Sequence, residues 1–126
     1  MGLWLVLPAV AQALPATARE RAEVFAGCAG SYAAEAEHQR LTDGSAYGQM
    51  MGRAELFTLL LDATLTDGLR EGAPAIALRI VQGNARARQR LLLTAAHYGI
   101  RASQSEIARH AATRRLALCE TLVLGN

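Results

Sequence analysis

The chain has 126 residues and a formal net charge of +2, and its 13 basic residues are all arginine. This length is enough for one domain with a single core and excludes a two-domain architecture. Because 11 acidic residues nearly balance the arginines, any charged surface must come from the distribution of charge and not from its total.

The first segment, residues 1–18, predicts a secretory signal peptide. It is apolar, has no charged residue before Arg19 and ends in Ala16-Thr17-Ala18, an A-x-A pattern typical of a cleavage site. A retained membrane anchor is the alternative, but the apolar run is short for a span and contains two prolines. Cleavage would leave residues 19–126 as a single helical domain without a membrane span, in the periplasm or secreted.

Four amphipathic segments follow and predict four helices. Their approximate bounds are 19–41, 46–67, 74–98 and 103–124. The connections are short and rich in glycine, which favours antiparallel neighbours. The predicted fold is therefore all-α, an up-down-up-down four-helix bundle.

Cys28 and Cys119 predict one disulfide, which would clamp the first helix to the fourth. An exported chain with two widely separated cysteines is the setting in which a disulfide persists. The bundle topology brings both cysteines to the same end, as a bridge with Cα atoms within about 7 Å requires. Closing this loop of 91 residues is worth about 4.6 kcal/mol in the chain-entropy model.

The third and fourth helices carry more specific expectations. The helix over 74–98 has a predicted inward stripe of Ala77, Ile80, Val81, Asn84, Ala87, Leu91, Ala95 and Tyr98. Its arginines at 79, 86 and 90 fall on the opposite side. Ser103 followed by Glu106 is a capping box, which predicts the start of the last helix.

Charge is divided unequally along the chain. Residues 19–73 contain five arginines and nine acids, whereas residues 74–126 contain eight arginines and only two acids. One interpretation is that the two halves neutralise each other across helix contacts. The other is a basic face for an acidic partner or an anionic lipid headgroup. Nucleic acid is not expected as the partner of an exported protein.

The helix order predicts that His38, His97 and His110 gather at the end of the bundle opposite the disulfide, with Glu35 and Glu106 beside them. Imidazole and carboxylate ligands suit zinc, iron or copper, so a metal-binding bundle is one functional hypothesis. Glu35-x-x-His38 matches one Glu-x-x-His element of di-iron bundles, but the second copy is missing. Histidines near helix C-termini are also explained by the helix dipole without any ligand.

The sequence contains no haem-attachment motif, H-E-x-x-H, phosphate-binding glycine loop or G-x-S-x-G elbow. The leading hypothesis is therefore a non-enzymatic interaction or structural module whose partner is a periplasmic protein or envelope component. A small hydrolytic enzyme is the last alternative. Residues 28–39, CAGSYAAEAEHQ, resemble a stretch of small exported uncharacterised helical proteins of alphaproteobacteria, and the resemblance implies export and helical character but no site.

Overall fold

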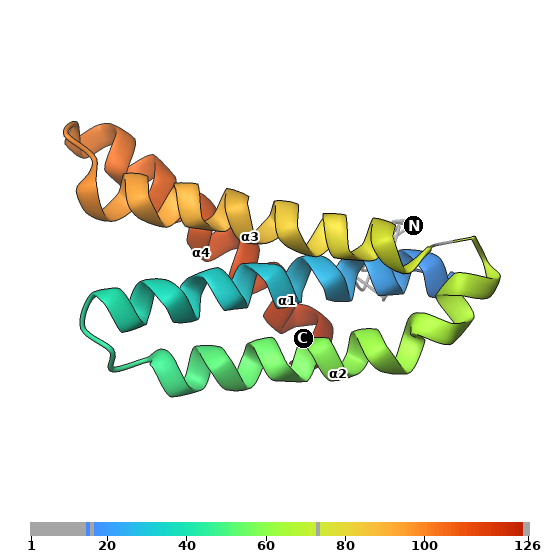
Figure 1. The fold of residues 1–126 in the computed structure, drawn as a ribbon. Helices are drawn as coiled ribbons and strands as arrows, with labels where there is room; N and C mark the ends of the chain where they lie inside the picture. Colours follow the sequence, from blue (N-terminus) through green and yellow to red (C-terminus); the bar gives the residue numbers. More distant parts are fainter. Residues whose placement is uncertain (1–14, 16, 73, 125–126) are drawn as a thin grey trace, which may run out of the picture.

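The computed structural model describes residues 15, 17–72 and 74–124. Its helices are α1 (Ala18–Leu41), α2 (Tyr47–Arg70), α3 (Ala75–Tyr98) and α4 (Ala102–Leu124). Consecutive helices run in opposite directions (Figure 1), and no strand occurs in the described part, so the predicted all-α four-helix bundle is confirmed. The predicted signal peptide falls almost entirely outside the described residues. None of the described helices is long and apolar enough to cross a membrane.

α1 lies at the centre of the bundle. α2 and α3 run along it, while α4 packs on α3 and passes behind α1 (Figure 1). None of the residues 21–39 is exposed, and the buried side chains of α1 point in all directions instead of forming one stripe. Most of them are alanine, glycine or serine, whose small volume lets three helices approach at once. The other helices therefore pack on the buried residues of α1, which form the centre of the core.

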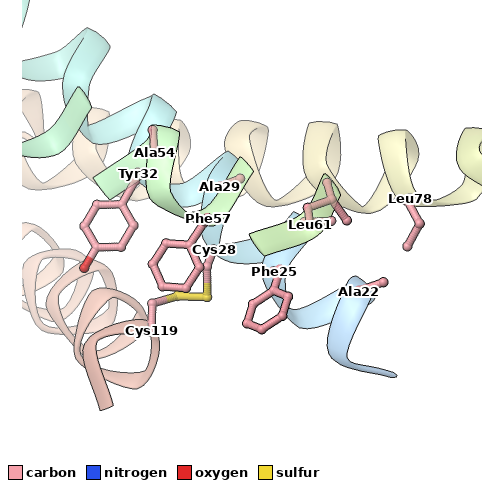
Figure 2. Packing of buried hydrophobic residues seen from close by; sticks show 11 residues of the cluster. Ala22, Phe25, Cys28, Ala29, Tyr32, Ala54, Phe57, Leu61, Leu78 and Cys119 are labelled. Atoms are coloured by element: carbon pink, nitrogen blue, oxygen red, sulfur yellow. A yellow bond between two sulfur atoms is a disulfide. The ribbon is translucent and has the colours of Figure 1, made fainter. Parts of the chain in front are cut away.

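Three aromatic rings hold α1 to α2. Phe57 of α2 stacks on Tyr32 with 5.7 Å between ring centroids and lies 6.3 Å from the ring of Phe25. Tyr32 and Phe57 are almost completely buried, and all three rings lie close to the disulfide (Figure 2). Aromatic pairs at these distances add stabilisation beyond the burial of their area. This cluster is the centre of the hydrophobic core.

A single glycine fixes the approach of α3 to α1. A Cβ atom built on Gly30 would overlap the backbone carbonyl oxygen of Gln82 and lie 3.0 Å from the backbone nitrogen of Arg86. Only glycine leaves room for a backbone this close. Gly30 therefore selects the face of α3 that contains Gln82 and Arg86 as the face that meets α1.

Two helix ends differ from the predicted bounds. α2 continues to Arg70, beyond the predicted end at residue 67, because Gly68 is buried inside the helix with its Cα facing the Ala22 side chain of α1. α4 begins at Ala102, so Ser103 lies within the helix and does not form the predicted capping box. The contact at this turn comes instead from Ser105, whose hydroxyl donates to the Gly99 carbonyl at 3.3 Å.

The start of α1 carries a cap that the sequence analysis missed. The Thr17 hydroxyl accepts a hydrogen bond from the Glu20 amide at 3.1 Å. Thr17-x-x-Glu20 has the spacing of a capping box, so the signal was present in the sequence. It was hidden because Thr17 also belongs to the A-x-A pattern of the predicted cleavage site.

Cys28 and Cys119 form the predicted disulfide, with 5.8 Å between their Cα atoms. Cys28 lies near the middle of α1 and Cys119 in the second half of α4, so the bond is not at the end of the bundle. The cause is the oblique course of α4, which ends behind the middle of α1 (Figure 1). The disulfide is the covalent link between α1 and this crossing helix.

Candidate functional site

The face that α3 turns inward is not the predicted one. Its buried residues are Leu78, Ala85, Gln89 and Leu93. Three members of the predicted stripe, Ile80, Leu91 and Tyr98, are instead exposed by 57%, 71% and 65%. Asn84 is also exposed, so its side-chain amide needs no hydrogen-bond partner in the core. The predicted stripe was therefore wrong as a core face. Of its members, Ala77 and Val81 are half-buried, with Val81 packed against the core, and the rest are exposed.

The reason is that α3 has apolar residues on two opposite sides, so periodicity alone cannot choose between them. Two features of α1 determine which side of α3 faces the core. Gly30 admits the backbone of α3 at Gln82. The Glu37 carboxylate forms ion pairs with Arg86 and with Arg90, the latter at 2.6 Å. These contacts turn the opposite side of α3 to solvent.

The outer face of α3 is defined here as Ile76, Ile80, Ala87, Leu91 and Tyr98, which are all exposed. They recur at three- to four-residue multiples and share one side of the helix. Monomeric proteins expose single apolar residues routinely, but several large apolar side chains exposed on one side of a helix indicate a contact surface. This surface exists because most of the α3 stripe that was predicted to face the core faces solvent instead.

The basic character of the second half is only partly neutralised. Glu37 compensates Arg86 and Arg90, and Arg109 donates to the Ala96 carbonyl at 3.3 Å. The other arginines of this half form no ion pair with any described residue; they are Arg79, Arg88, Arg101, Arg114 and Arg115. The two halves are therefore neutralised across helix contacts only in part, and α3 and α4 keep a basic surface.

Glu35 belongs to a polar contact that joins three helices. Gln89 of α3 is fully buried, and its Nε2 donates to Glu35 Oε1 at 2.9 Å and to the Ala112 carbonyl of α4 at 3.1 Å. Burial raises the pKa of Glu35, although the bond from Gln89 acts in the opposite direction. Gln89 Oε1 has no hydrogen-bond partner among the described residues. The buried Gln89 amide thus fixes Glu35 in the core, a role that the sequence analysis missed.

Two of the three histidines converge. The rings of His38 and His97 meet edge to face, with 5.3 Å between their centroids. Burial, and then the neighbouring His97, lower the pKa of His38. Both rings line a hollow of about 210 Å³, whose remaining walls are Glu35, Gln39, Leu93, Ala96 and Arg109. The structure therefore brings together His38, His97 and Glu35 around one small space.

His110 and Glu106 do not line this hollow. They lie on the exposed surface of α4, where His110 Nε2 and Glu106 Oε1 are 3.8 Å apart as an i, i+4 pair. Among the described residues, no group of three or more histidine, cysteine, aspartate or glutamate side chains is arranged to hold a metal ion. The five predicted ligands are thus divided between the hollow and the α4 surface, because the rotation of α4 directs His110 outward.

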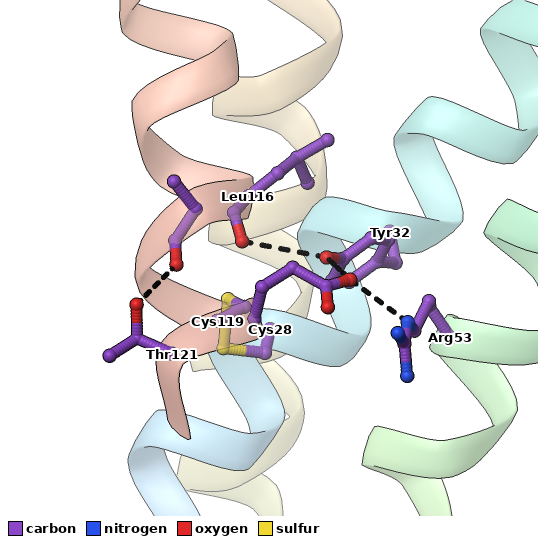
Figure 3. The surroundings of a disulfide bond; sticks show 8 residues. Cys28, Tyr32, Arg53, Leu116, Cys119 and Thr121 are labelled. Atoms are coloured by element: carbon purple, nitrogen blue, oxygen red, sulfur yellow. Dashed lines mark hydrogen bonds and ion pairs between the residues drawn. A yellow bond between two sulfur atoms is a disulfide. The ribbon is translucent and has the colours of Figure 1, made fainter. Parts of the chain in front are cut away.

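A second polar network lies beside the disulfide (Figure 3). The buried Tyr32 hydroxyl donates to Glu120 Oε1 at 2.6 Å, and the same carboxylate oxygen pairs with Arg53 Nε at 2.9 Å. Burial and the bond to Glu120 raise the pKa of Tyr32. Arg53 comes from α2 and Glu120 from α4, so the network links three helices around Cys119. It gives a structural role to one of the two acids in the basic half.

No family model, curated protein or solved structure matches this chain. The resemblance of residues 28–39 to exported alphaproteobacterial proteins stays a prediction.

Proposed function

We propose that this protein is an exported, non-enzymatic interaction module whose partner is an envelope component, the anionic surface of a phospholipid membrane. The outer face of α3 is the docking surface. The observation that carries the proposal is the exposed apolar stripe on a helix that has four arginines and no acid.

The composition of this face matches that of helices that lie in a membrane interface. Such helices combine an apolar side with flanking basic residues and gain from both burial and attraction to anionic lipids. Arg79 and Arg88 project on the two flanks of the stripe and have no ion pair among the described residues. Tyr98 and the fully exposed Ile100 extend the apolar surface to the turn before α4.

The charge argues against a second copy of this chain as the partner. Packing α3 against α3 would place arginines opposite arginines, since residues 73–105 contain no acid. Like charges brought together in a contact are unfavourable. An anionic surface supplies the compensating charge along the whole helix.

Location outside the cytoplasm is part of the same proposal. A disulfide persists in oxidising compartments, and the predicted cleavage site, after Ala18, coincides with the start of α1. The processed protein should begin at Arg19 and show no tryptophan fluorescence, because Trp4 is the single tryptophan. An intact mass of the exported protein that includes residues 1–18 would contradict cleavage.

Vesicle sedimentation tests the docking surface. We expect binding to phosphatidylglycerol vesicles, weak binding to phosphatidylcholine vesicles, and loss of binding in an Ile80→Glu, Leu91→Glu variant. Each change removes a contact worth about 1.5 to 3 kcal/mol when fully buried. Leu59→Glu on α2 is the matched control, because Leu59 is 66% exposed but lies outside the face. Equal binding by both variants would refute the proposal.

Metal binding is a second candidate, and the convergence of the His38 and His97 rings, with 5.3 Å between their centroids, favours it. Imidazole is a ligand that zinc and copper accept. Titration with each metal should give stoichiometric binding that His38→Ala abolishes and His110→Ala leaves unchanged. Binding that survives His38→Ala would remove this candidate.

A further inference from the structure

An open groove lies between α1, α3 and α4, separate from the outer face of α3. It has a volume of about 620 Å³, within the range of small-ligand sites. Val24, Val81, Leu118 and Leu122 contribute apolar walls, and the Cys28–Cys119 disulfide lies in the wall between α1 and α4. The groove is therefore largely apolar, and a covalent link joins two of the helices that form it.

Among the described residues that line the groove, two are charged, and both are arginines. Arg88 of α3 and Arg115 of α4 both line it, and neither forms an ion pair with a described residue. Burial, and then the proximity of Arg88, lower the pKa of Arg115. Glu120, the nearest acid along α4, is already bound to Tyr32 and Arg53. The two positive charges thus face an apolar space without compensation.

We propose that the groove binds a single-chain anionic amphiphile, a long-chain fatty acid. Its carboxylate would lie between Arg88 and Arg115, and its acyl chain would cover the apolar walls. Guanidinium groups bind carboxylates through paired charge-assisted hydrogen bonds, and a pair of them repels less when an anion lies between.

The chain's own first segment is the competing occupant, because Pro15 also lines the groove. Residues 1–14 are apolar but contain no acid, so they would leave both arginines uncompensated. A fatty acid would cover the apolar walls with its acyl chain and compensate both arginines with its carboxylate. Charge complementarity therefore favours the carboxylate ligand.

The test is calorimetric titration of the disulfide-bonded full chain with oleate below its micellar concentration, with oleyl alcohol as the neutral analogue. We expect saturable 1:1 binding of oleate and at least tenfold weaker binding of the alcohol, since hydrogen bonds to charged groups are worth about tenfold or more each. The Arg88→Gln, Arg115→Gln variant should bind oleate at least tenfold more weakly. Arg114→Gln is the control, because Arg114 is exposed on α4 outside the groove and has no ion pair with a described residue.

Leu118→Glu provides a second variant that needs no change in the core, since Leu118 is 52% exposed. The new carboxylate would neutralise the arginines and abolish oleate binding, while circular dichroism stays that of the parent. Equal oleate affinity in the parent and the double arginine variant would overturn the proposal. So would absence of binding together with a blue-shifted Trp4 emission, which would identify residues 1–14 as the occupant. Vesicle docking is tested separately with the Ile80→Glu, Leu91→Glu variant, because neither of these residues lines the groove.

Discussion

The two halves of the molecule use their apolar residues differently. In the α1–α2 half, residues 19–73, the central helix is buried on every side and the net charge is −4, from five arginines and nine acids. In the α3–α4 half, residues 74–126, the net charge is +6, from eight arginines and two acids. Of the ten exposed large apolar side chains among the described residues, seven belong to the second half.

This difference follows from side-chain size. α1 has small residues all round and can accept three neighbours, whereas α3 has large apolar residues on two sides and only one of these sides meets the core. Stability is therefore concentrated around α1, and the surfaces available for binding belong to α3 and α4. Variants that act on one half and not the other test this division.

Removal of the disulfide should have the largest effect. The Cys28→Ser, Cys119→Ser variant is expected to lose about 2 to 5 kcal/mol of unfolding free energy. α1, α2 and α3 should keep their packing, while hydrogen exchange of the second half of α4 becomes faster. Urea unfolding with and without a reducing agent measures the loss. An unchanged unfolding midpoint after reduction would contradict it.

Gly30→Ala should be the next most damaging change. Its Cβ would overlap the Gln82 carbonyl, and relief of such overpacking costs about 1 to 3 kcal/mol. Gly27→Ala is the matched control, because a Cβ there meets nothing within 4 Å. The control should be neutral or more stable by up to about 1 kcal/mol, since alanine favours helix. Similar losses in both variants would show that α3 does not depend on this close approach.

The pH dependence of the unfolding free energy should show the titration of the Glu35 carboxyl group. Because its pKa in the folded protein lies above the ordinary value of 4.5, the folded state retains the proton between these two values. This contribution stabilises the fold at low pH and is lost as the pH rises through the folded pKa. His38, whose pKa is lowered, acts oppositely: its contribution is fully present above pH 6.5 and is lost as the pH falls through the folded pKa.

Glu35→Gln should therefore remove the decline in unfolding free energy that begins near pH 4.5. His38→Ala should leave that decline in place and alter the curve near pH 6.5. Thermal unfolding across this range separates the two. A Glu35→Gln curve parallel to that of the parent would contradict the assignment.

The smallest effect is expected at the start of α1. The Arg19 amide donates to Glu71 Oε2 at 2.8 Å, so cleavage after Ala18 would place the new α-amino group beside this carboxylate. Glu71→Gln should then cost the processed protein less than about 1 kcal/mol, an amount that high salt removes. Glu55→Gln is the control, because Glu55 is exposed on α2 and has no ion pair with any residue that the structure describes. Equal effects of the two changes would rule out the proposed terminal contact.

Much of the fold could be predicted from local patterns. Helical periodicity and turn residues located the four helices to within a few residues, and with only two cysteines the disulfide had one possible pairing. Prediction failed where two signals competed. Thr17 suited both a cleavage site and a helix cap, and α3 offered two apolar faces.

The candidate site, like the fold, could be predicted from the sequence only in part. The sequence by itself determined that His38 and His97 lie at the same end, because helix order and rise per residue settle position along the axis. Whether two rings meet depends on helix rotation, at 100° per residue, and rotation is set by contacts with other helices. Gly30 and Glu37 make those contacts with α3. For His110, the oblique crossing of α4 sets the rotation. Only the tertiary structure could therefore decide which residues face one another, which face of α3 stays in solvent, and that Arg88 and Arg115 share a groove.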